Sequence, residues 1–193
     1  MGTVAALYVE PRGVYSQIDG VDVYGVHDVN VPGMFDRDAA LYAGPHAVVA
    51  HPPCGPWGLF AWNYKGGEGG RHLGPLAVQQ VRAWGGILEH PKGSQLWKHC
   101  DLPKVGELDR YGGTTKQIEQ VHWGHPCTKP TWLYCCRVPS FPPMPRRVGE
   151  PTHCMVRLRR NSHERPELPK RLRHLTPPAL AWWLVAAARR VHA

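Results

Sequence analysis

The sequence lacks an apolar run that could cross a bilayer, because no stretch approaches the roughly 18 consecutive apolar residues that a membrane helix needs. It also lacks the basic and then apolar pattern of a secretory signal peptide at its start. Six cysteines without an export signal indicate reduced thiols and not a disulfide framework. We therefore expect a cytoplasmic protein with no membrane partner.

Acidic residues are few, since 15 aspartates and glutamates stand against 23 lysines and arginines, which gives a formal charge of +8. The sequence also contains eight tryptophans and 12 histidines. A basic chain rich in aromatic residues is typical of proteins that bind polyanions, above all nucleic acids. A basic surface that only aids solubility explains the charge equally well. The apolar fraction of 42% excludes a disordered tail, because it is enough to form a core.

Short apolar segments separated by turns dominate the first half of the sequence. The 21 glycines and 20 prolines, without any repeat, indicate many turns and exclude a helical bundle. The order strand, loop, helix, strand predicts an α/β fold with a small, reduced Rossmann-like sheet and short crossovers. Strands are expected at 3–9, 21–26, 46–50 and 86–89, a helix at 75–84, a hairpin at 117–123 and 131–136, and a last strand at 152–158.

The end of the sequence predicts a helix, because apolar residues recur at helical spacing from Leu180 to Val191. Thr176 is expected to cap it. We divide the chain into an α/β catalytic core at 1–138 and, at 139–193, a Pro-rich basic segment whose helix packs on that core.

The most informative segment is His51-Pro52-Pro53-Cys54-Gly55-Pro56-Trp57-Gly58, directly after the third expected strand. In parallel sheets, chemistry gathers in the loops beyond the carboxyl ends of strands. The two prolines fix the backbone and Gly55 allows a close approach to a ligand, so the segment presents Cys54 as a nucleophile. The alternative is a small buried thiol in a Pro-Gly turn.

Two further segments follow in order, Leu88-Glu89-His90-Pro91 and Trp123-Gly124-His125-Pro126-Cys127-Thr128-Lys129-Pro130-Thr131-Trp132-Leu133. With Pro-Pro-Cys, this ordered set resembles the DNA cytosine-C5 methyltransferases. The resemblance implies DNA as the partner, with Cys54 attacking C6 of a flipped pyrimidine, Glu89 holding N3 and the exocyclic group, and Lys129 near the nucleotide. Residues expected around the substrate are Pro53, Gly55, Trp57, His90 and Arg82.

The thiolate is the reactive form of cysteine, so a nucleophile needs a neighbour that lowers its pKa. His51, Lys65 and Arg82 are the nearby basic candidates. Compact proteins with Ala-His-Pro-Pro-Cys-Gly-Pro-Trp and Lys-Pro-Thr-Trp-Leu segments look like phage-encoded relatives of the methyltransferases. That resemblance implies action in a host cytoplasm, and it leaves open a changed reaction at C5.

By resemblance, the cofactor is S-adenosylmethionine. The family binds it with an Asp-Leu-Phe-x-Gly-x-Gly loop, where this sequence has Leu7-Tyr8-Val9-Glu10-Pro11-Arg12-Gly13 and no second glycine. About ten residues separate the first two expected strands, too few for the usual crossover helix. Glu10, or Asp28 after the second strand, is the candidate to hold the ribose.

Two other interpretations stay open. Histidines and cysteines of the second half could supply zinc ligands, although their spacing fits no standard finger. The zinc candidates are His122, His125, Cys127, Cys135, Cys136, His153 and Cys154. The fold could instead serve a catalytically inactive module that binds nucleic acid or a host factor through the basic run from Arg157 to Arg173.

Overall fold

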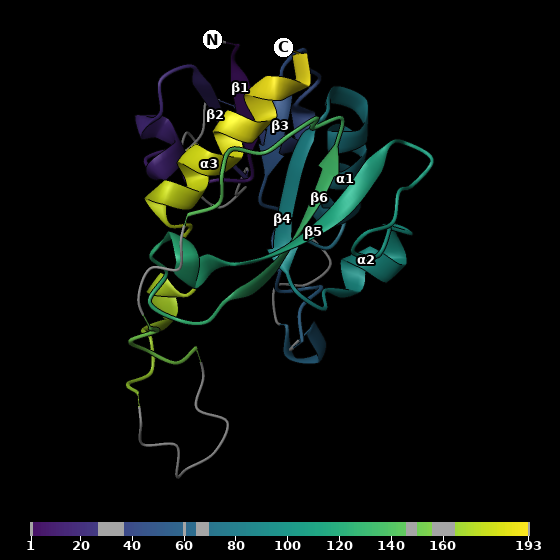
Figure 1. Cartoon of the computed structure of the whole chain (residues 1–193). Coiled ribbons are helices and arrows are strands. Elements are labelled where there is room, and N and C mark those ends of the chain that lie inside the picture. The colour runs from purple at the N-terminus through teal and green to yellow at the C-terminus, as the bar shows by residue number, and fades with distance from the viewer. Residues whose placement is uncertain are drawn as a thin grey trace.

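A computed structural model of the chain describes residues 2–26, 37–59, 61–64, 70–145, 150–155 and 165–192. Its centre is one six-stranded sheet with the order β2-β1-β3-β4-β6-β5 (Figure 1). Strands β1 to β4 are parallel to one another, and β6 runs antiparallel to both β4 and β5. The strands are β1 (Val4–Leu7), β2 (Val21–Tyr24), β3 (Ala47–Ala50), β4 (Gly86–Pro91), β5 (Gly113–Glu119) and β6 (Pro130–Cys136).

Helices cover both faces of the sheet, which explains why β1 and β3 are continuous buried apolar runs. Helix α3 (Pro178–Ala188) lies across one face and α1 (Leu73–Trp84) across the other (Figure 1). Successive side chains of a strand alternate between these layers. Along β4, Ile87 packs in the cluster beneath α3, whereas Leu88 packs in the cluster beneath α1 and the short helix α2 (Gln95–His99).

The two strands that carry the candidate site approach each other closely. A Cβ at Gly86 would lie 1.9 Å from the Val48 carbonyl oxygen, and the φ of Gly86 is 120°, so only glycine fits there. This contact sets the parallel register in which Ala50 pairs with Leu88. The loop after β3 and the last residues of β4 therefore lie at the same edge of the sheet.

The expected α/β fold with a C-terminal helix is confirmed. The connection from β1 to β2 is also short as expected, and it contains the 3-10 helix Val14–Gln17 in place of a crossover α-helix. Among the described helices, none is both long and apolar enough to cross a membrane.

Several boundaries differ from the expectation. The hairpin is present, but its first strand is β5 at Gly113–Glu119, and Gln120–Trp123 forms a 3-10 helix. Pro177, not Thr176, occupies the N-cap of α3, and it forms no side-chain capping bond. Of the expected strand at 152–158, the described residues 152–155 contribute an isolated bridge from Cys154 to Glu167.

Candidate active site

The structure brings the three expected catalytic residues together at the carboxyl edge of the sheet. Cys54 lies in the loop after β3, Glu89 lies within β4, and Lys129 precedes β6. The antiparallel pairing of β4 with β6 places Lys129 beside the end of β4, where the Lys92 amide donates to the Pro130 carbonyl over 3.0 Å. The charges of Glu89 and Lys129 both act on the Cys54 thiol, so the three groups form one electrostatic cluster.

The loop that carries Cys54 is a tight turn. The Cys54 carbonyl accepts hydrogen bonds from the amides of Trp57 (3.1 Å) and Gly58 (2.8 Å), and Cys54 itself is exposed. We expected Gly55 to admit a ligand. Instead, a Cβ at Gly55 would lie 2.5 Å from the ring of Tyr64, so this glycine makes room for a tyrosine of the same chain.

The pKa of the Cys54 thiol is raised above its ordinary value, which favours the protonated form near pH 7. Although the residue has exposed surface, the neighbouring protein removes part of the water around the thiol and raises its pKa, and the negative charge of Glu89 raises it further. The charge of Lys129 opposes this shift, but the net direction is upward. Of the three candidates for lowering this pKa, Lys65 lies outside the described residues, and His51 and Arg82 bind other groups.

Glu89 is ionised and held by hydrogen bonds from two side chains. His51 Nδ1 lies 3.0 Å from Glu89 Oε2, and Gln120 Nε2 donates to Glu89 Oε1 over 2.8 Å. Burial, the largest influence, raises the pKa of Glu89. The hydrogen bond and charge of His51, with the charge of Lys129, outweigh burial and lower the pKa to about 2, and His90 adds a small lowering effect where acid has protonated it.

A buried chain of polar groups extends from Glu89 away from the thiol. Tyr15 Oη lies 2.6 Å from His51 Nε2, and Gln120 Nε2 also donates to Thr131 Oγ1 over 3.0 Å. Tyr15 and Gln120 are not among the residues expected from the sequence, and Thr131 belongs to the quoted Lys-Pro-Thr-Trp-Leu segment without an assigned role. His51 was visible beside Pro-Pro-Cys, but its partner is the carboxylate and not the thiol.

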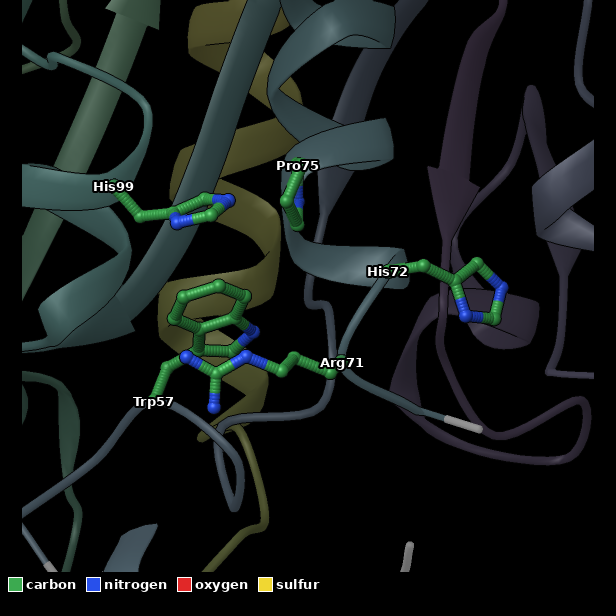
Figure 2. Close-up of a pocket in the computed structure, with 5 residues that line it drawn as sticks. All are labelled: Trp57, Arg71, His72, Pro75 and His99. Atoms are coloured by element: carbon green, nitrogen blue, oxygen red, sulfur yellow. The ribbon is translucent and has the colours of Figure 1, made fainter. Parts of the chain in front are cut away.

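Two of the expected substrate contacts support the site from inside the protein. His90 is 0% exposed, and burial lowers its pKa to about 4, so its imidazole is neutral near pH 7. Its position on β4 directs it to the α1 face, opposite Glu89, where it lies near the Pro53 carbonyl and Trp97. Trp57 is 1% exposed and packs against Arg71 and His99 (Figure 2).

Arg82 belongs to a different cluster from Cys54. Its guanidinium donates to Tyr134 Oη (3.1 Å), to the Cys100 carbonyl (3.3 Å) and to Asp109 (3.3 Å). Tyr134 packs in the cluster beneath α1, whereas Glu89 and His51 lie on the α3 face. The expected substrate contact of Arg82 is therefore replaced by a structural role, because three groups of the fold occupy its donors.

The end of β1 does not fit the expected cofactor loop. Tyr8 follows β1 with a φ of 61°, an unusual backbone conformation for a bulky residue, and its buried hydroxyl donates to Gln80 over 2.7 Å. Glu10 is exposed, and its carbonyl accepts the Gly13 amide over 2.9 Å. Asp28 lies outside the described residues. A tyrosine thus stands where the resembled family has a glycine-rich loop.

Among the described residues, no group of three or more His, Cys, Asp or Glu side chains is placed to hold a metal ion. No protein-family model matches the chain, and no curated protein matches it in sequence. The geometry of the site therefore carries the functional argument.

Proposed function

We propose that this protein modifies pyrimidine bases of DNA at C5, with Cys54 as the nucleophile that adds to C6. The observation that carries the proposal is the convergence of Cys54, Glu89 and Lys129 in one electrostatic cluster. They come from three separate segments, and a thiol, a carboxylate and an ammonium whose charges act on one another are the groups that this chemistry needs. The net charge of +8 supports DNA as the substrate.

The reaction begins when Cys54 loses its proton to water and its sulfur bonds to C6. The C5–C6 double bond opens, and its electron pair moves to C5, which then takes an electrophile or a proton. Loss of the original C5 hydrogen as a proton and departure of the thiolate restore the ring. Glu89, being ionised, accepts a hydrogen bond from the exocyclic amine of cytosine. The base must leave the stack, at a cost of a few kcal/mol.

S-adenosylmethionine is the group donor that the resemblance implies, but Tyr8 and the exposed Glu10 do not fit it. We therefore derive no methyl-transfer step. The proposal takes an electrophilic one-carbon donor as the co-reactant, and the addition to C6 requires no cofactor.

Hydrogen exchange at C5 tests the proposal without a donor. Duplex DNA is incubated with the protein in D₂O, digested and examined by nucleoside mass spectrometry. We expect deoxycytidine to become one mass unit heavier with wild type and with Cys100→Ala, a control at the partly buried C-cap cysteine of α2, but not with Cys54→Ala. Equal exchange with Cys54→Ala would overturn the proposal. Nucleosides from cells that express the protein would identify the transferred group.

A catalytically inactive DNA-binding module is the second candidate. Both Glu89 oxygens already accept hydrogen bonds from the protein, and the raised pKa of Cys54 disfavours the reactive thiolate. Both features favour a protein without catalytic activity. The same experiment separates the two functions. Wild-type protein that binds the duplex but leaves C5 hydrogen unexchanged is a binding module.

A further inference from the structure

A hollow beside Trp57 lies on the α1 side of the molecule, apart from the Glu89 cluster. Two adjoining cavities of about 390 and 460 Å³ share Trp57, Arg71 and His99 as lining residues, and Figure 2 shows the lining of the first. We call them together the Trp57 hollow. Its remaining lining residues are His72, Pro75, Gln95 and Lys98.

The lining of the Trp57 hollow is positively charged. Arg71 and Lys98 carry full charges, His72 and His99 add two imidazoles, and the described lining residues include no carboxylate. The Arg71 guanidinium lies 4.5 Å above the centre of the Trp57 ring, and the His99 ring centre lies 4.8 Å from it. The indole therefore holds the Arg71 guanidinium in place without neutralising it, and it packs against the His99 ring.

Unused hydrogen-bond donors lie beside the same cations. Helix α1 begins here at Leu73, and its N-cap residue His72 makes no side-chain capping bond. The first helical hydrogen bond runs from the Leu76 amide to the His72 carbonyl and Pro75 has no amide hydrogen, so only the Leu73 and Gly74 amides precede it without a helical acceptor. Trp57 Nε1 is buried without an acceptor among the described residues. It lies against the first turn of α1, 2.7 Å from the position of a Cβ at Gly74. The indole donor thus lies at the positive, N-terminal end of the α1 dipole.

We propose that the Trp57 hollow binds a phosphate group of the DNA backbone, an inference that rests on the proposed function. A phosphate offers several acceptor oxygens and a negative charge, which match the donors and cations of the hollow. The Trp57 amide donates to the Cys54 carbonyl, so the hollow and the nucleophile belong to one turn. A phosphate held there fixes the DNA strand relative to Cys54.

Salt dependence of DNA binding tests this site. Neutralising one phosphate contact lowers the slope of log affinity against log salt by about 0.9. We expect Arg71→Gln to show this loss, so that its affinity changes about 3.5-fold less than wild type between 50 and 200 mM salt. Arg110→Gln is the matched control, because Arg110 is also exposed and lies over an aromatic ring, Tyr111. Equal slopes for both variants would overturn the inference.

A second measurement uses a variant that keeps the aromatic ring. Trp57→Phe identifies the Trp57 indole signal in ¹H–¹⁵N spectra, and that signal should shift when a short DNA duplex is added. A shift with inorganic phosphate or deoxycytidine monophosphate, but none with DNA, assigns the hollow to free phosphates and overturns the backbone site. If wild type exchanges the C5 hydrogen normally but Arg71→Gln leaves the salt slope unchanged, the phosphate site is wrong and the catalytic proposal stands. If wild type shows no exchange but Arg71→Gln reduces the slope, the catalytic proposal is wrong and the phosphate site stands.

Discussion

Acid should weaken this fold through Glu89. The carboxylate has a pKa of about 2 in the folded protein, against an ordinary value of 4.5. A carboxyl whose pKa is lowered on folding stabilises the protein above its unfolded pKa, and this contribution disappears as the pH falls toward the folded pKa. The affected window is therefore roughly pH 5 to pH 2.

The shift of about 2.5 pKa units corresponds to roughly 3 kcal/mol of stability at neutral pH. Glu89 is only 9% exposed, so solvent screens its hydrogen bonds from His51 and Gln120 weakly. Between pH 5 and pH 3, the linkage relation gives a loss of about 2 kcal/mol from this group.

Urea unfolding followed by circular dichroism measures this loss. Wild type and Glu89→Gln are compared at pH 5 and pH 3, because other carboxyl groups titrate in both proteins and cancel in the comparison. We expect the free energy of unfolding of wild type to fall by about 2 kcal/mol more than that of Glu89→Gln. Parallel losses in the two proteins would refute the ionised, hydrogen-bonded state of Glu89.

Two further predictions concern the contact between strands and the thiol. Gly86→Ala should lower the free energy of unfolding by more than about 3 kcal/mol, because the Cβ of the new alanine meets the Val48 carbonyl. Gly93→Ala, also at positive φ but with open space around it, should lower it by about 1 kcal/mol. Similar losses for the two variants in thermal unfolding would refute the close strand contact. At pH 8, iodoacetamide should label exposed Cys54 before buried Cys135. Labelling of Cys54 should be faster in Glu89→Gln and slower in Lys129→Met, because the charge of Glu89 raises the thiol pKa and that of Lys129 lowers it. Labelling rates by peptide mass spectrometry that do not change in either variant would contradict the electrostatic cluster.

The parts of the fold that depend on local pattern could be predicted from the sequence. The apolar runs of β1, β3 and α3 mark buried elements without reference to the rest of the chain, and the length of the last run indicates a helix. The start of β5 could not be found this way, because Thr115 is a polar residue at a buried position. It is satisfied by distant groups, accepting from Trp97 Nε1 over 2.8 Å and donating to the Pro103 carbonyl.

In the candidate site too, some residues could be predicted from local sequence, whereas others depend on contacts that only the fold makes. Cys54, Glu89 and Lys129 stand in short, recognisable segments, so sequence reasoning could name them. Tyr15 and Gln120 reach the site through contacts across 36 and 31 residues, and nothing in their neighbourhoods distinguishes them from ordinary core residues. The occupied donors of Arg82 were equally hidden, because they depend on which face of the sheet α1 covers.

The raised pKa of Cys54 has a direct bearing on the proposed reaction. Part of the shift comes from the negative charge of Glu89, and Glu89 is the group that the base edge would approach. A cytosine amine that donates to this carboxylate draws its charge away from the thiol, while the opposing charge of Lys129 stays in place. In the proposed reaction, binding of the base would therefore favour the thiolate, and without the base the thiol would stay protonated and less open to oxidation. The proposed nucleophile would then depend on its substrate for activation.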